Sequence, residues 1–253
     1  MLLSFLATFA ATYLAMVAFY FATGFAVTAW NRRNGARRIQ ADRDGEKRRG
    51  VEIRQSMKAL AVSALLFAGG LFAQNQGWTP APIEASWWSV PVFFVLVMVL
   101  FDAWFYFGHR LLHTKALYHY HAIHHRSVAP TVWSNDSSGL VDTLIEHGFY
   151  LIIWFVLPVP AVAMVALRVF DQVSGMIGHS GFEYFASPTA RRPWPLICTT
   201  FHDLHHAQFR VNYGNFFSIW DRLCGTVHPD YDGMVARMED GMPPAEATAR
   251  RAN

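Results

Sequence analysis

Eight of the twelve histidines in this 253-residue chain fall in three clusters that repeat nearly the same spacing. The clusters read His109-Arg-Leu-Leu-His113, His121-Ala-Ile-His124-His125 and His202-Asp-Leu-His205-His206. Because positions i, i+3 and i+4 share one face of a helix, each cluster can direct two or three imidazoles at one point. A ninth, His179, lies in a Gly-His-Ser-Gly segment. Imidazole binds zinc, copper, iron and nickel, so the pattern predicts a metal site.

Nine imidazoles are more than one ion needs, and the spacing predicts two ions. A closed structural zinc site uses four ligands. Adjacent residues such as His124 and His125 point about 100° apart around a helix, so they can serve neighbouring ions. The Glu-x-x-His pairs of soluble di-iron bundles are absent from the sequence. Because imidazoles add no negative charge, such a dimetal site would be strongly electrophilic when oxidised. It could then use O2 to remove hydrogen from an unactivated C–H bond.

The composition predicts a membrane protein. The chain is 53% hydrophobic and 15% charged, against about 25% charged in an average soluble domain. Its apolar residues form runs over Leu2–Trp30, Leu60–Ala73 and Ser89–Phe107. The first run has no basic residues before it and is too long for a signal peptide, so we expect an uncleaved span. The two cysteines exclude a disulfide framework or a thiolate zinc site.

The basic residues orient these spans. Nine of the 21 Lys and Arg residues lie between Arg32 and Arg54, as expected for a loop beside a membrane and not for a nucleic-acid-binding surface. The positive-inside rule puts this loop, residues 31–56, in the cytoplasm and the N-terminus outside. The third span then returns to the cytoplasmic side, where it ends at His109.

A fourth apolar stretch, residues 148–167, is divided by Pro158 and Pro160. Both arms are short for a full crossing, so we expect a helical hairpin that dips into the membrane and returns. Two full spans over 140–157 and 161–177 remain the alternative, and they would have to bury Asp142, Glu146, Arg168 and Asp171. The predicted fold is therefore an all-α integral membrane protein with about three spanning helices, this hairpin and a cytoplasmic helical cap holding a His-rich dimetal site. Residues 1–88 hold two spans, 89–230 the catalytic domain and 231–253 a polar, disordered tail.

The motifs resemble the fatty acid hydroxylase superfamily, in particular its sterol desaturase and C4-methylsterol oxidase branch. The resemblance covers roughly residues 92–226. It is carried by HRLLHTKALYHYHAIHHRSVAPT from His109, GHSGFE from Gly178, FHDLHHAQFRVNYGNF from Phe201 and WDRLCGT from Trp220. It implies an integral-membrane enzyme that holds two iron ions, with zinc as a substitute in a purified form. Its implied metal ligands are His109, His113, His121, His124, His125, His179, His202, His205 and His206.

Six further residues are candidates for supporting these ligands. Asp203 lies inside the third cluster and Asp102 about two helical turns before His109, so either carboxylate could hold an imidazole, as carboxylates near metal sites do. His119 is expected to support a ligand or lie at the surface, and His147 to pack or support. Asn212 and Tyr213 are supporting candidates by the resemblance alone.

The predicted activity is O2-dependent hydroxylation or desaturation of a sterol-like or fatty-acyl-type lipid. No dinucleotide-binding fingerprint occurs in the sequence, so the electrons are expected from a separate ferredoxin, or from a cytochrome with its reductase. Arg outnumbers Lys 18 to 3, which favours a GC-rich bacterium and hence its inner membrane. The alternative is a zinc-dependent membrane lipid hydrolase using the same histidines, although such a site needs only three protein ligands.

Overall fold

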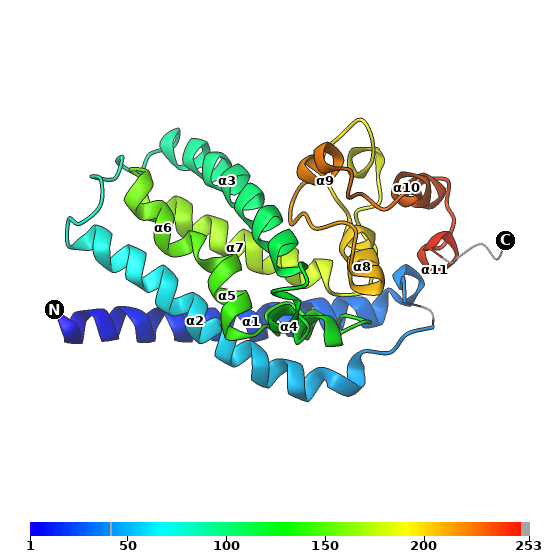
Figure 1. Cartoon of the computed structure of the whole chain (residues 1–253), viewed down its shortest axis with the longest axis horizontal. Helices are drawn as coiled ribbons and strands as arrows, with labels where there is room; N and C mark the ends of the chain where they lie inside the picture. The colour runs from blue at the N-terminus through cyan, green and yellow to red at the C-terminus, as the bar shows by residue number, and fades with distance from the viewer. Residues whose placement is uncertain (41, 249–253) are drawn as a thin grey trace.

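The computed structural model describes residues 1–40 and 42–248, and every regular element in them is helical. Long helices run along the molecule, and the short helices of residues 199–248 gather at the end that carries the C-terminus (Figure 1). The long helices are α1 (Leu2–Arg33), α2 (Arg49–Asn75), α3 (Ser89–Leu112) and α7 (Ala161–Gly178). The short ones are α4 (Tyr118–His121), α5 (Leu140–His147), α6 (Phe149–Val156), α8 (Thr199–Gln208), α9 (Ile219–Cys224), α10 (Tyr231–Glu239) and α11 (Pro244–Thr248). The all-α prediction is confirmed.

Four helices are long and apolar enough to cross a membrane: Leu2–Arg33, Glu46–Asn75, Ser89–Leu112 and Ala161–Gly178. The first three contain the predicted apolar runs. The most hydrophobic part of α1 has none of its residues buried against the protein, as expected for a helix that lipid surrounds. Where α1 does contact its neighbours, Gly24 lets it lie against the Trp133 ring, because a Cβ there would come within 2.5 Å of that ring. The chain is therefore a membrane protein.

Aromatic side chains fill the centre of the bundle between α2, α3, α6 and α7. Phe67, Phe101 and Trp154 are fully or almost fully buried in this cluster. The Trp154 ring meets α2 at Gly70, where a Cβ would lie 2.1 Å from Trp154 Cδ1. This close approach joins the hairpin to the second span and fixes the depth of α6 against α2.

The second arm of the hairpin is longer than the sequence predicts. Its first arm consists of α5 and α6, which join at Gly148, and its second arm is α7. The sequence predicts that the second arm ends before Arg168, but α7 continues through this residue to Gly178. The Arg168 guanidinium donates to Asp171 Oδ2 over 3.3 Å and to Gln172 Oε1 over 2.6 Å. These partners satisfy the charge inside the bundle, so the arginine does not end the helix.

The basic loop lies at the same end of the bundle as the histidine clusters. Helices α1, α3 and α7 end there and α2 begins there. Gln40 in this loop donates to Pro130 O over 3.1 Å, beside the second histidine cluster. The loop therefore contacts the segment that follows the second histidine cluster.

The predicted disorder from residue 231 onward is wrong for residues 231–248. Helix α10 buries Tyr231, Met234 and Val235 against α8, and α11 follows it. The prediction relied on the polar average composition of the segment. It overlooked these few apolar residues, which share one face of the helix. The rest of the predicted tail, residues 249–253, lies outside the described residues.

Candidate metal centre

The nine predicted ligands meet in two groups. In each group, one candidate ligand atom from every histidine lies within 4.8 Å of all the others. The first group contains His109, His113, His121, His125 and His205, and the second contains His124, His179, His202 and His206. The adjacent pairs 124/125 and 205/206 each divide between the groups, as their angular separation on a helix predicts. Either group could hold a metal ion.

Four segments carry these side chains. His109 lies in the last turn of α3 and His113 is its C-terminal cap, while α8 carries the third cluster. His179 is the C-terminal cap of α7. The second cluster is not one regular helix as the spacing suggests, because it divides between α4 and a 3-10 turn at His124–Arg126. The helical bonds from Ala122 N to Tyr118 O and from Arg126 N to Ala122 O nevertheless continue through it and keep the histidines on one face.

The outer nitrogens of four imidazoles face hydrogen-bond acceptors. Nδ1 of His109 lies 2.9 Å from Tyr213 O, and Nδ1 of His121 lies 3.0 Å from Asp142 Oδ2. Nδ1 of His179 lies 2.8 Å from Gly175 O, and Nδ1 of His205 lies 2.7 Å from Val211 O. A neutral imidazole carries one N–H, and these partners place it on Nδ1. Each Nε2 then presents a lone pair to its group.

These Nε2 atoms converge at distances that suit a shared cation. Neighbouring Nε2 atoms lie 2.9 to 3.3 Å apart, in the pairs 109–121, 113–125, 125–205, 124–179, 179–202 and 202–206. A metal about 2.1 Å from two nitrogens at right angles separates them by about 3.0 Å. Lone pairs facing one another at this distance repel unless a cation lies between them. The residues present therefore fit a metal ion in each group.

Burial keeps the imidazoles in the form that binds metal. It lowers the pKa of His179 to about 4. Burial, reinforced by the neighbouring imidazoles, lowers the pKa of His124, His202 and His206 well below the usual range. All four are therefore neutral near pH 7, and neutral imidazole is the ligand form.

Asp142, which the sequence analysis did not select for this role, is hydrogen-bonded to His121, and Glu146 lies in the same group of side chains. Asp142 is fully buried and reaches His121 from the first turn of α5. The predictions for the other two acids are wrong. Asp102 accepts from the backbone N–H groups of Phe216 and Phe217, and Asp203 accepts from Gln40 and Arg43. A charged residue in an apolar stretch was the available signal for Asp142.

Among the described residues, one of the four remaining candidates for supporting the histidines contacts a clustered histidine through a hydrogen bond and three do not. Tyr213 supports His109 through its carbonyl, and its ring packs 5.1 Å from that of His113. Asn212 donates to Phe201 O and accepts from His228 N, which ties α8 to the segment after α9. His119 is exposed. His147 bonds Ser63 and contacts none of the nine histidines through a hydrogen bond in the described part of the chain.

The part of the basic loop that contains Gln40 and Arg43, called the strap below, lies against the third cluster. Asp203 on α8 accepts from Gln40 Nε2 at 2.6 Å and pairs with Arg43. Arg43 also donates to Val128 O over 2.6 Å, next to the second cluster. The loop between the first two apolar helices thus fixes two histidine-bearing segments against each other.

A largely apolar cavity of about 460 Å³ adjoins the histidines. His109, His124, His179 and His202 line one part of it. Phe105, Phe170 and Phe217 are among its apolar walls, and α5 and α7 add polar side chains to it. Its size is within the range of natural small-molecule sites, so a lipid-sized apolar group fits next to both histidine groups.

Comparison with known proteins identifies the family. The family model described as "Fatty acid hydroxylase" matches residues 94–226, which include both histidine groups. The chain belongs to the fatty acid hydroxylase family. No solved structure matches it.

Curated relatives of this fatty acid hydroxylase family member include sterol enzymes. It is 30% identical over 193 residues to a Delta(7)-sterol 5(6)-desaturase of Gibberella zeae, across 74% of this chain and 53% of the relative. It is 35% identical over 154 residues to methylsterol monooxygenase 1 of Gallus gallus, across 57% and 51%. The chain spans about half the length of the curated relatives it matches. The resemblance to the sterol desaturase branch is confirmed.

Proposed function

We propose that this protein oxidises a lipid with O2, either hydroxylating it or introducing a double bond. One observation carries the proposal: two converging histidine groups adjoin one apolar cavity in a membrane-helix bundle. The names of the relatives, sterol desaturases and methylsterol monooxygenases, agree with it. A sterol-like or fatty-acyl-type lipid is the proposed substrate class.

The proposed cofactor is a pair of iron ions held by the nine histidines, five at one site and four at the other. When bound, the iron pair supplies redox chemistry that activates O2 for hydrogen removal from the lipid. Zinc, which takes the same imidazole ligands, is the expected substitute in a purified form.

The reaction needs an outside source of electrons. Hydroxylation converts R–H, O2, two electrons and two protons into R–OH and water. Desaturation uses the same O2, electrons and protons, removes two hydrogens from the lipid and releases two waters. We propose that a ferredoxin, or a cytochrome with its reductase, supplies the electrons to the histidine end of the molecule.

The chain's own groups orient the ligands and keep the site dry. The acceptors Tyr213 O, Asp142, Gly175 O and Val211 O hold four imidazoles with Nε2 turned inward. Such partners set the ring orientation and raise the basicity of the ligands. The aromatic walls of the cavity exclude water from the lipid carbon that reacts.

We further propose that the histidine end faces the cytoplasm and that the N-terminus lies outside. The support is the basic loop at that end of the bundle and the positive-inside rule. The excess of Arg over Lys favours a bacterial inner membrane, although the relatives named above come from eukaryotes.

The test is accurate-mass analysis of lipids from cells with and without the gene, grown with and without O2. We expect an O2-dependent gain of 16 mass units for hydroxylation or a loss of 2 for desaturation. The purified protein should contain two iron ions per chain, and His124→Ala or His205→Ala should each remove the iron of its own group and abolish the product. Turnover under strict anaerobiosis would instead support a zinc-dependent hydrolase.

A further inference from the structure

The segments that hold the group of five histidines expose only positive charges. Residues 103–141 and 199–229 carry all five histidines of this group. The exposed Arg, Lys, Asp and Glu side chains of these two segments are all basic, and we call them the basic rim: Arg110, Lys115, Arg126 and Arg210. Within the described residues, none of the four forms an ion pair with an acid.

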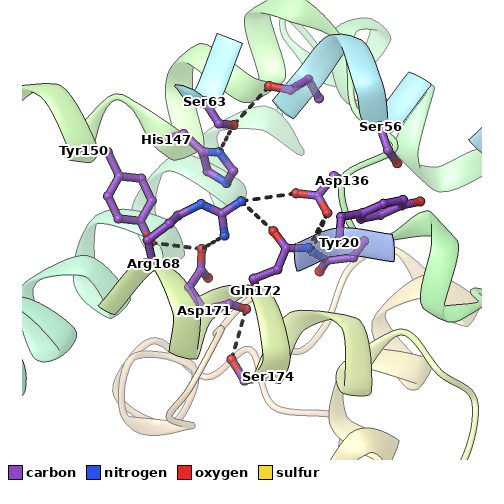
Figure 2. Close-up of polar contacts among 12 residues, drawn as sticks. Tyr20, Ser56, Ser63, Asp136, His147, Tyr150, Arg168, Asp171, Gln172 and Ser174 are labelled. Atoms are coloured by element: carbon purple, nitrogen blue, oxygen red, sulfur yellow. Dashed lines mark hydrogen bonds and ion pairs between the residues drawn. The ribbon is translucent and has the colours of Figure 1, made fainter. Parts of the chain in front are cut away.

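The acids of the same two segments do not neutralise the rim, because each is buried and has other partners. Asp136 pairs with Arg168 inside the bundle, where Figure 2 shows the guanidinium between Asp136 and Asp171. Asp203 pairs with the strap, and Asp221 accepts from two backbone N–H groups. The positive charge of the rim is therefore left to attract a partner from outside.

One histidine of the group of five reaches the outer surface. Of the nine clustered histidines, His113 and His202 are half-buried and the others are buried. His202 lines the apolar cavity, whereas His113 does not. The exposed part of His113 therefore faces the outside of the molecule. Its Nε2 atom lies 3.0 Å from that of His125, so the exposed ring leads directly into the group.

Three cations of the rim are close to this histidine along the chain. Arg110 precedes His113 by three residues on α3, and Lys115 follows it by two. Arg126 is the residue after His125, whose ring centroid lies 4.8 Å from that of His113. All three side chains are exposed. The positive charges of the first segment thus gather where the group of five meets the surface.

Arg210 joins the rim from the second segment. Burial raises the pKa of Tyr213, and the positive charges of Arg110 and Arg210 both oppose this shift, so both guanidinium groups lie near its hydroxyl. The Tyr213 ring centroid lies 5.1 Å from that of His113. The two segments therefore bring their cations to the same histidine.

Charge and position together select the kind of partner. A surface of unpaired cations attracts an acidic protein and repels a basic one. The proposed oxidation consumes two electrons, and the sequence has no dinucleotide-binding fingerprint through which the chain could draw them itself. Electron transfer between proteins slows as donor and acceptor move apart. A carrier is therefore most effective where a clustered histidine reaches the surface.

We propose that an acidic one-electron carrier protein docks on the basic rim and passes its electron to the site at His113. The inference rests on the proposed function in taking the histidine groups as a redox site, and it adds the docking surface and the charge of the partner. Each docking oxidises one carrier and delivers one electron, so one turnover uses two carriers in succession.

The test measures binding and needs no turnover. Metal-loaded protein in phosphatidylcholine nanodiscs is titrated at low ionic strength with a plant-type [2Fe–2S] ferredoxin, which is acidic, and with cytochrome c, which is basic. We expect the ferredoxin to bind at least about tenfold more tightly than the cytochrome. Raising the ionic strength to about 0.5 M should remove most of this difference, because salt screens exposed charges.

Charge reversals test the place of binding. Lys115→Glu and Arg210→Glu, one from each segment, should each weaken ferredoxin binding about fivefold. Arg192→Glu is the matched control, because it makes the same change of net charge at a side chain outside the rim that is 74% exposed. It should weaken binding about twofold or less. Metal content and far-UV circular dichroism confirm folding, and either rim variant alone decides if the other does not fold.

Absence of ferredoxin binding to the wild-type protein, or an equal loss in Arg192→Glu, overturns the proposal. An unchanged ferredoxin affinity in the rim variants overturns it too. If these variants then carry less phosphatidylglycerol through purification, the rim binds anionic lipid instead.

The outcome is separate from that of the proposed function. Ferredoxin docking on the rim without any O2-dependent lipid product would refute the oxidation and leave the docking surface. An O2-dependent product together with an unchanged ferredoxin affinity in the rim variants would do the reverse.

Discussion

Removing the Asp142 carboxylate should weaken one histidine group and leave the other intact. Asp142 lies 3.0 Å from His121 Nδ1, and both side chains are at most 1% exposed. The substitution Asp142→Ala deprives the imidazole of the partner that orients it. Loss of such a partner lowers metal affinity by about 10- to 100-fold, or about 1.4 to 2.7 kcal/mol. His121 belongs to the group of five, so the group of four should keep its ion.

The assay is iron retention during titration with a chelator. Wild-type protein should lose two ions over one range of chelator concentration, whereas Asp142→Ala should lose one ion at a chelator concentration about 10- to 100-fold lower. Asp142→Asn keeps a neutral acceptor and should fall between them. Asp102→Asn is the matched control, because Asp102 is equally buried but accepts from backbone N–H groups and not from a histidine. Retention of both ions in Asp142→Ala with wild-type affinity would refute the reasoning.

Three further predictions concern the bundle, the strap and the metal. Gly70→Ala should lower the free energy of unfolding in detergent by about 1 to 3 kcal/mol, because its Cβ meets Trp154 at 2.1 Å. Gly50→Ala, which opens on free space in the same helix, should stabilise by up to about 1 kcal/mol, and equal shifts would contradict this packing. Asp203→Ala should release the strap and speed tryptic cleavage after Arg43 about tenfold, whereas an unchanged rate would mean that the pair does not hold the loop. Chelation should lower the unfolding temperature and iron(II) should restore it, and a temperature insensitive to metal would count against convergent ligands.

Local patterns in the sequence were sufficient to find the first three spans and the nine histidines that converge in the structure. The apolar runs predict the first three spans because a helix surrounded by lipid needs a continuous apolar surface. The i, i+3, i+4 spacing predicts the histidine face because residues three and four apart meet on a helix. The apolar runs and the histidine spacing are both properties of short stretches of chain, so they can be recognised without knowledge of the fold.

Prediction from the sequence failed at charged residues whose position depends on a partner in another segment. Arg168 looks like a helix end in the sequence, yet ion pairs with Asp136 and Asp171 keep it inside α7. Asp203 looks like a support for a neighbouring histidine, yet Arg43, 160 positions away, takes its carboxylate. Burial and pairing depend on which segments meet, and spacing along the chain does not report this.

The sequence by itself therefore determined that this is a membrane protein of the fatty acid hydroxylase type with nine clustered histidines. Only the tertiary structure divided these into groups of five and four and selected Asp142 as the partner of His121. The physical reason is that residue type and periodicity set what a side chain can bind. The packing of α2, α3, α5, α7 and α8 sets which atoms come within hydrogen-bonding distance.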